Sequence, residues 1–218
     1  MPILVFDDLD YFPRDATIEA IQDVTLPLAG NGSVRVRRVA GDTAPSLNFV
    51  PKIAFSQGAT RGRLRAHMRS ALAPVESLSW GLACMQSQRQ ISAGTGNAYG
   101  LRLGYRNAGA DGFLELVKYT GGLPSEGATL ATTPLTPGTT LNCLQLEWLT
   151  SPDVGGVALV GWHGVAADFS DLAILLLTQD VDAPFTTTVT EGGFVACFGS
   201  FDNIDIRFDQ MRLEGPPL

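Results

Sequence analysis

The chain has 218 residues, of which 45% are hydrophobic and 17% charged, and its formal net charge is −7 at pH 7. So many apolar residues, without a block of like charges, exclude an intrinsically disordered chain and are enough for one large core. The acidic balance argues against nucleic acid as the partner, because phosphates are bound by clustered Lys and Arg. All-β domains commonly reach this length, so we expect a single domain over residues 1–218.

The N-terminal residues carry no pattern of an export signal. Residues 1–13 have no basic region and no apolar stretch of signal-peptide length, and Asp7 and Asp8 interrupt them early. Even the apolar run Leu172–Thr178 is too short to span a bilayer. The sequence therefore predicts synthesis in the cytoplasm without a signal peptide, and no membrane partner.

The first quarter of the chain contains short runs in which apolar and polar residues alternate. Such alternation is typical of strands, and Asn31-Gly32 is a strong hairpin signal. We predict four strands here: 3–9, 24–28, 34–39 and 48–55. Residues 15–21 fit one short helical turn. We interpret residues 1–23, approximately, as an N-terminal arm and residues 214–218 as a C-terminal tail, both able to extend to neighbouring molecules.

Two sets of residues carry side chains of the metal-binding type. Asp7, Asp8 and Asp10 are adjacent carboxylates, but Ca²⁺ requires six or more oxygen ligands from several segments. The sequence has three cysteines: Cys84, Cys143 and Cys197. They are far apart and form no Cys-x-x-Cys motif, and their odd number argues against a disulfide framework. We predict buried free thiols, no metal and no cofactor.

Four arginines and a histidine occupy every second position of residues 61–69. This spacing places them on one face of a strand, with Leu64 and Met68 on the opposite face, toward the core. We interpret the basic face as a solvated strand face rather than an anion-binding patch.

A predicted β-hairpin over residues 98–119 stands at the centre of the chain. In its first strand Leu101, Leu103 and Tyr105 share one face, and Arg102 and Arg106 share the other. The second strand alternates in the same way. Residues 107–112, between the strands, are Asn, Asp, Gly and Ala, a composition that favours a turn with positive φ.

The rest of the chain predicts further strands and no alternation of strands with helices. The strands are expected at 62–70, 77–86, 128–132, 141–149, 157–164, 193–198 and 203–214. Trp80 lies in the second of these, in phase with apolar neighbours, and is assigned to the core. Residues 168–178 fit either a short helix or a loop followed by a strand, and residues 186–189 are β-prone. The Pro- and Gly-rich segment 120–139 is otherwise irregular.

The order of three features resembles the concanavalin A-like jelly roll, the lectin, glucanase and laminin-G-like group. The features are Arg63–Ala66 and Leu78–Met85 before Tyr99–Leu103; Leu144–Trp148 before Gly155–Trp162; and Gly192–Phe198 before Phe201–Ile206. The resemblance covers roughly residues 60–213. It implies an all-β antiparallel sandwich with at most one or two short helices. This fold hosts enzymes, lectins and structural proteins, so it does not select a function.

The sequence lacks the Glu-x-Asp-x-x-Glu strand of family-16-like glucanases. A retaining glycosidase needs two carboxyl groups about 5–5.5 Å apart. Glu115 and Glu147, one in each of two strands, are the remaining pair for a glycoside hydrolase of this type. We interpret them as polar-face residues, since half-buried strands expose alternate side chains, and we predict that the protein is not an enzyme.

We therefore favour a non-catalytic structural protein that self-associates and binds other proteins of an assembly. Such a protein resembles the jelly-roll decoration, cement and tail proteins of tailed phages, which places it in a virion. The predicted assembly contacts are Phe12, Pro13, Pro124, Pro134, Pro137, Pro216 and Pro217. The alternative is a lectin-like module that binds a glycan through Tyr105, Trp162 and His163.

Overall fold

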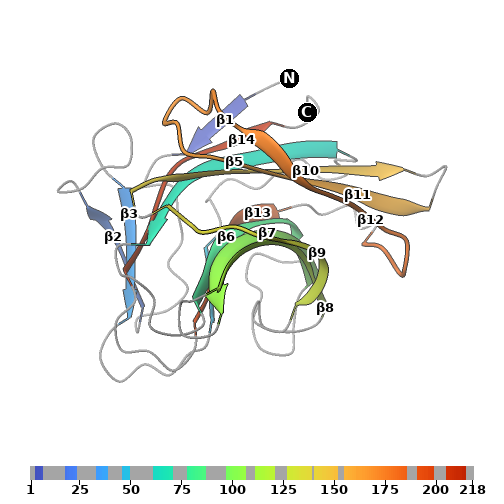
Figure 1. Ribbon diagram of the computed structural model, residues 1–218, viewed down its shortest axis with the longest axis horizontal. Coiled ribbons are helices and arrows are strands. Elements are labelled where there is room, and N and C mark those ends of the chain that lie inside the picture. Colours follow the sequence, from blue (N-terminus) through green and yellow to red (C-terminus); the bar gives the residue numbers. More distant parts are fainter. Residues whose placement is uncertain are drawn as a thin grey trace.

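The computed structural model of the chain describes residues 3–6, 18–23, 33–38, 46–49, 61–70, 78–86, 97–106, 111–120, 127–138, 140–151, 155–185, 191–198 and 205–214. These residues form two antiparallel sheets, as the sequence predicts, and they contain no helix (Figure 1). Figure 1 shows the six-stranded sheet arching below the eight-stranded sheet, with its hollow side turned away from it.

The eight-stranded sheet has the order β12-β11-β10-β5-β14-β3-β2, and β1 also pairs with β14. Its strands are β1 (Ile3–Phe6), β2 (Ile18–Asp23), β3 (Ser33–Arg38), β5 (Arg61–Ser70), β10 (Asn142–Ser151), β11 (Gly156–Gly164), β12 (Ala173–Asp180) and β14 (Asp205–Glu214). Two strands of the predicted N-terminal arm, β1 and β2, therefore lie in the sheet of their own chain.

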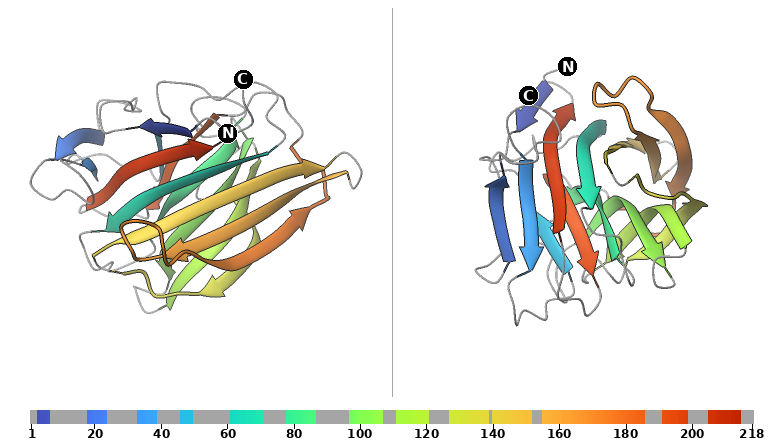
Figure 2. Two further views of the ribbon diagram at one scale, coloured as in Figure 1. Left: turned by 90° about the horizontal axis from the view of Figure 1, so that it is seen from above. Right: turned by 60° about the vertical axis from the view of Figure 1, so that its left-hand side comes forward.

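The six-stranded sheet has the order β4-β13-β6-β7-β8-β9. Its strands are β4 (Ser46–Phe49), β6 (Leu78–Gln86), β7 (Asn97–Arg106), β8 (Asp111–Thr120), β9 (Ala128–Pro134) and β13 (Glu191–Phe198). The edge strands β9 and β12, one from each sheet, lie against each other along the same margin of the sandwich (Figure 2).

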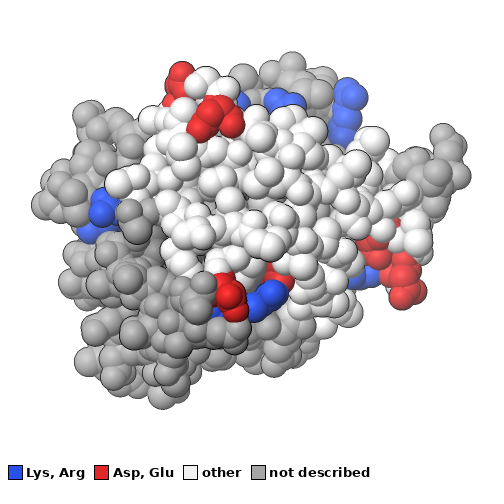
Figure 3. All heavy atoms as spheres, in the orientation of Figure 1, with Lys and Arg blue, Asp and Glu red and all other residues white. Residues whose placement is uncertain are grey.

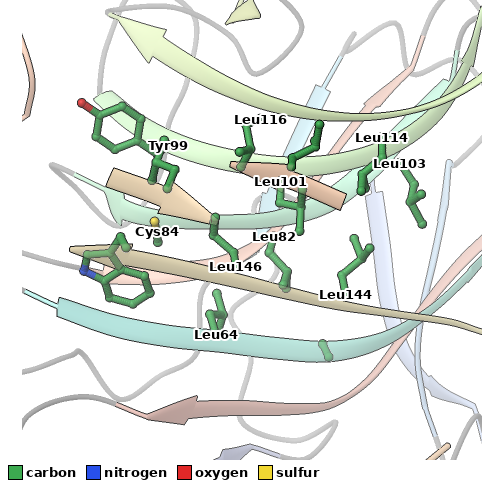
Figure 4. Close-up of a cluster of buried hydrophobic side chains, with 14 of the residues drawn as sticks. Leu64, Leu82, Cys84, Tyr99, Leu101, Leu103, Leu114, Leu116, Leu144 and Leu146 are labelled. Carbon is green, nitrogen blue, oxygen red and sulfur yellow. The ribbon is translucent and has the colours of Figure 1, made fainter. Parts of the chain in front are cut away.

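The core lies between the sheets and follows from the period of two along each strand. Leucines of β5, β6, β7, β8 and β10 point toward one another in Figure 4, among them Leu64, Leu82, Leu101, Leu116 and Leu146, and all five are fully buried. Burial of each such side chain contributes about 1.5–3 kcal/mol, so this layer provides the main force that holds the two sheets together.

Several expectations about the core are confirmed. The hairpin predicted around residue 110 is β7 and β8, paired in register from Asn97–Thr120 to Arg106–Asp111. Trp80 is buried in the core. Cys84 and Cys143 are buried free thiols; burial raises the pKa of both, that of Cys143 to about 12. The side chain of Cys197 lies outside the described residues.

The structure corrects the sequence prediction at the N-terminus. Residues 18–21, expected in a helical turn, belong to strand β2, which pairs with β3 from Ile18–Arg38 to Asp23–Ser33. The helical expectation rested on a local preference, and hydrogen bonds to a neighbouring strand outweigh such a preference. The predicted strand 24–28 and the Asn31-Gly32 turn lie outside the described residues, as do residues 186–189.

The alternatives left open for residues 168–178 are resolved in favour of a loop and a strand. Strand β12 begins at Ala173, after a turn. The Asp171 carboxylate accepts the backbone N–H groups of Val165 and Ala166 at 2.8 and 2.9 Å, and these bonds lower the pKa of Asp171. A side chain that caps the loop in this way competes with helix formation.

Candidate functional site

The first candidate site is an ion cluster on the outer, hollow face of the six-stranded sheet. Leu114 and Leu116 of β8 face the core, so Glu115 between them faces outward. Glu115 stands directly opposite Arg102 of β7. The Arg102 Nε and Nη2 atoms donate to Glu115 Oε2 at 3.0 and 2.8 Å, and Arg106 Nη2 donates to Oε1. Glu115 is fully buried, so both guanidinium groups balance a charge that water does not reach.

A buried aromatic ring packs against this cluster. The guanidinium of Arg106 lies 4.4 Å from the centroid of the Phe113 ring, a cation–π contact. Arg106 is half exposed, at 49%, whereas Arg102 is largely covered. Arg106 is therefore the member of the cluster that a ligand reaches.

A cavity of about 630 Å³ opens beside Arg106 and Phe113. Asp111 and Thr132 add a carboxylate and a hydroxyl to its wall. A few convergent polar groups beside an aromatic ring are the usual composition of a small-ligand site. The site combines hydrogen-bond donors and acceptors with an apolar ring that lies under the Arg106 guanidinium. Glu115 accepts three guanidinium hydrogen bonds, which leaves it poorly placed to act as a general base.

The rim of the cavity is fixed by the segment after β9. The N–H of Leu135 donates to the carbonyl of Gly112 at 3.0 Å, and a Cβ on Gly112 would stand 2.4 Å from the Leu135 oxygen. The Tyr105 hydroxyl donates to the carbonyl of Pro137 at 3.2 Å. Position 112 therefore requires glycine, and Tyr105 holds this rim from the inner side of the sheet.

The structure does not bring the three predicted glycan-binding residues together. Tyr105 is half-buried in the six-stranded sheet and packs against the core. Trp162 and His163 are neighbours on β11 of the other sheet, so their side chains point to opposite faces. The His163 ring Nε2 lies 3.1 Å from Asn142 Oδ1, and burial lowers its pKa while Asp171 opposes that shift. These three residues do not form one surface.

Glu115 and Glu147 also lie apart, which corrects the glycoside hydrolase hypothesis. Glu147 is on β10 of the eight-stranded sheet, between the core residues Leu146 and Trp148, and therefore faces outward from that sheet. Its Oε1 pairs with Arg63 Nε at 2.8 Å. The two carboxylates are on opposite outer faces of the sandwich, so they do not form the retaining pair that the mechanism requires.

The second candidate site is the β9/β12 edge, defined as residues 128–134 of β9 and 173–179 of β12. Neither stretch contains a charged residue. Leu177 is 71% exposed and Ile174 is 55% exposed, and Leu175 is also exposed. Figure 2 places this edge on the near side of Figure 1, and Figure 3 shows that side as a broad uncharged area with charged groups at its margins.

Of the predicted assembly contacts, the structure describes Pro134 and Pro137. Pro134 is exposed at the end of β9 and lines the Arg106 cavity. Pro137 is buried. The others lie outside the described residues: Phe12, Pro13, Pro124, Pro216 and Pro217. The sequence predicts residues 172–178 to be too short to span a membrane and to belong to a short helix or a strand, and it does not identify them as a contact surface. The signal in the sequence was that residues 172–177 are all apolar, whereas a strand with one solvent-exposed face alternates apolar and polar residues.

No group of three or more His, Cys, Asp or Glu side chains among the described residues is arranged to hold a metal ion. The same part of the chain contains no helix long and apolar enough to cross a membrane.

No protein-family model matches the sequence, and no curated protein matches it either. Solved structures do match. A legume lectin-like domain from Entamoeba histolytica superposes with a TM-score of 0.58 at 9% identity, over 96% of this chain and 95% of that one. The exoplasmic/lumenal domain of VIP36, in a form bound to Ca²⁺ and Man3GlcNAc, gives 0.57 at 9%, over 99% and 89%.

A third match is the cellulose-induced protein Cip1, with a TM-score of 0.53 at 16% identity, over 95% of this chain and 92% of that one. These likenesses extend over nearly the whole chain, and the two sheets are antiparallel throughout. The protein therefore has the concanavalin A-like, legume-lectin-like fold. At such low identities the likeness shows the fold alone, because this sandwich hosts many functions.

Proposed function

We propose that the protein is a non-catalytic component of a larger assembly and docks through the β9/β12 edge. The observation that carries this proposal is the exposure of large apolar side chains on an uncharged edge strand, above all Leu177 and Ile174. Edge strands of soluble proteins are normally protected by charged side chains or proline, because their unpaired backbone groups are templates for another chain. Residues 172–179 contain neither a charge nor a proline.

A virion is the setting that we favour, with the protein as a capsid decoration or tail protein. Jelly-roll sandwiches serve as viral capsid domains as well as lectins. In such a particle many copies are held by contacts between protein surfaces, and an exposed apolar edge is suited to a contact of this kind. Contiguous exposed apolar surface on a protein commonly marks a site of interaction with another molecule.

The docking edge is tested with Leu177→Lys. Burial of an exposed leucine contributes about 1.5–3 kcal/mol, so a lysine there is expected to weaken association at least tenfold. We would express tagged wild-type and variant chains in the source of the protein and compare the fraction of each that co-sediments with particles larger than the monomer.

Leu149→Lys is the matched control, because Leu149 is 48% exposed on β10 of the same sheet but lies away from the edge. It should co-sediment as the wild type does. Equal sedimentation of the wild type and Leu177→Lys would show that this edge is not the docking surface.

The Arg106 cavity favours a second candidate function, the binding of a glycan. It lies on the hollow face of a lectin-like fold, and it presents Arg106 and Thr132 as polar groups beside the Phe113 ring. Small-ligand sites commonly combine a few directed hydrogen bonds with apolar lining. The VIP36 match has a bound glycan, which supports the class of ligand without identifying it.

Arg106→Ala is expected to weaken glycan binding by about tenfold or more, since a hydrogen bond to a charged group contributes about 1.5–3 kcal/mol. A glycan array would select the ligand, and titration calorimetry would compare the variants. Arg61→Ala removes an exposed arginine from β5 of the other sheet and serves as control. If no glycan binds, or both variants bind equally well, the cavity is not a glycan site.

A further inference from the structure

A cavity of about 340 Å³ that belongs to neither candidate site lies on the outer face of the eight-stranded sheet, over β5, β10 and β11. Figure 2 (left) looks down on this face, where the three strands run side by side. Leu64, Trp148 and Leu159 of these strands are in the core, so the residues that alternate with them point outward. Six outward residues line the cavity: Arg61, Arg63, Glu147, Leu149, Ala158 and Val160.

Strand register arranges these side chains in two parallel rows. Arg61 of β5 stands opposite Leu149 of β10, and Leu149 stands opposite Ala158 of β11. The second row, two residues further along β5, consists of Arg63, Glu147 and Val160. Each row therefore begins with an arginine and ends with an apolar side chain. The rows differ in the middle, where the first has a leucine and the second has a carboxylate.

The two arginines differ in what balances their charge. Arg63 Nε donates to Glu147 Oε1 at 2.8 Å. Arg61 is exposed, and no hydrogen bond or ion pair joins its guanidinium to another group in the part of the chain that the structure describes. In its row the place of the carboxylate is taken by Leu149, which is 48% exposed. The lining of the cavity therefore has two guanidinium groups and one carboxylate, and a net positive charge.

The rest of the lining limits what can carry the anion that Arg61 lacks. Leu149, Ala158 and Val160 form an apolar floor without a hydrogen-bonding side chain. An apolar group that covers this floor is favoured, because it removes apolar surface from water. At the roughly 30 Å³ that one water molecule occupies in the liquid, the cavity has room for about ten non-hydrogen atoms. The neighbouring row shows that a carboxylate is a suitable partner for an arginine in this position.

We infer that this cavity binds a small amphiphilic monoanion, a carboxylate on an apolar body of about ten non-hydrogen atoms in all, with the carboxylate on Arg61 and the body over the apolar floor. Arginine binds a carboxylate through two parallel hydrogen bonds, so Arg61 fixes the orientation of the ligand as well as its charge. Glu147 already engages Arg63, so Arg63 frames the site and Arg61 makes the contact. The site rests on neither the docking edge nor the Arg106 cavity.

Titration calorimetry with octanoate tests the site, because octanoate has a carboxylate on an apolar chain of this size. Acetate has the same head without the body, and octylammonium has the same body with the opposite charge. We expect octanoate to bind the wild type at one site, and the other two probes to bind about tenfold more weakly or less, since each lacks the apolar contact or the negative charge. Acetate that binds as well as octanoate would show an adventitious ion only, and octanoate that does not bind would overturn the inference.

Substitutions in the Arg61 row locate the ligand. Arg61→Ala should lower the affinity for octanoate about tenfold or more, because it removes hydrogen bonds from a charged donor. Leu149→Glu supplies the missing carboxylate from the chain itself, in the position that Glu147 has in the other row, and should lower the affinity at least as far. Leu149→Gln has a side chain of the same size without the charge and should lower it less.

Arg106→Ala is the control and should bind octanoate as the wild type does, because Arg106 lies on the outer face of the other sheet. Arg61 and Leu149 are exposed, so these substitutions leave the fold intact, which equal melting temperatures would show. An unchanged affinity in Arg61→Ala overturns the inference. Equal losses in Leu149→Gln and Leu149→Glu would also overturn it, since the ligand would then be held without regard to charge.

Discussion

Replacing Glu115 with alanine is expected to lower the free energy of unfolding by about 3–5 kcal/mol, the usual cost of removing one partner from a buried ion pair. Glu115 is fully buried and Arg102 is 12% exposed, so the substitution removes the carboxylate that accepts two hydrogen bonds from a largely covered guanidinium. Arg106 is half exposed and is hydrated again without a comparable cost. Urea unfolding followed by circular dichroism measures the difference.

Glu147→Ala is the matched control. Glu147 and Arg63 form the corresponding pair on the other sheet, with exposed fractions of 24% and 41%. A pair this exposed contributes at most about 1 kcal/mol. Near-equal losses for the two variants would show that Glu115 is not held in a water-free environment.

A double replacement separates charge from packing. Arg102→Met with Glu115→Leu removes both charges and fills their space, and buried pairs replaced in this way are often neutral or stabilising. We expect the double variant to recover most of the stability lost by Glu115→Ala. Failure to recover would mean that Glu115 contributes through contacts other than its ion pair.

Replacing Asp180 with alanine is expected to cost about 3–4 kcal/mol. Asp180 is buried at the end of β12 and accepts the Tyr99 hydroxyl at 2.5 Å and the Lys118 ammonium at 2.7 Å. Both partners belong to the six-stranded sheet, so this carboxylate joins the two sheets beside the β9/β12 edge. The substitution leaves Lys118 with the carbonyls of Asp182 and Ala183 and the face of the Phe185 ring, and without a counter-charge from Asp180.

Thermal unfolding of Asp180→Ala against Asp182→Ala measures this cost. Asp182 is exposed, and a surface substitution of this kind changes stability by about 0.5 kcal/mol or less. Equal melting temperatures for the two variants would exclude a structural role for the Asp180 contacts.

The contribution of Tyr99, which donates to Asp180, to the free energy of unfolding is expected to depend on pH. Burial, and then the hydrogen bond to Asp180, raise the pKa of Tyr99 above its ordinary value of about 10. Because the folded state holds the proton more tightly, this contribution is complete below pH 10, approximately, and is lost as the pH rises toward the folded pKa. Tyr99→Phe should flatten the alkaline fall in stability of the wild type.

The alternation of residues along the chain was enough to predict the class of fold and much of the core. It placed Leu101 and Leu103 on one face of a hairpin strand and Arg102 on the other, because a strand turns successive side chains to opposite sides. It also assigned Trp80 to the core. These predictions need only the local period of two.

The tertiary structure decided which strands are neighbours and which outer face of the sandwich each outward side chain occupies. Sequence alone left Glu115 and Glu147 as a pair, whereas the sheet order puts them on opposite faces of the sandwich. The uncharged apolar run of β12 also did not reveal whether its side chains are exposed, since such a run is buried in a central strand and can be exposed at an edge, as Leu177 is here. The physical reason is that strand order depends on hydrogen bonds between distant segments, which no local pattern of residues encodes.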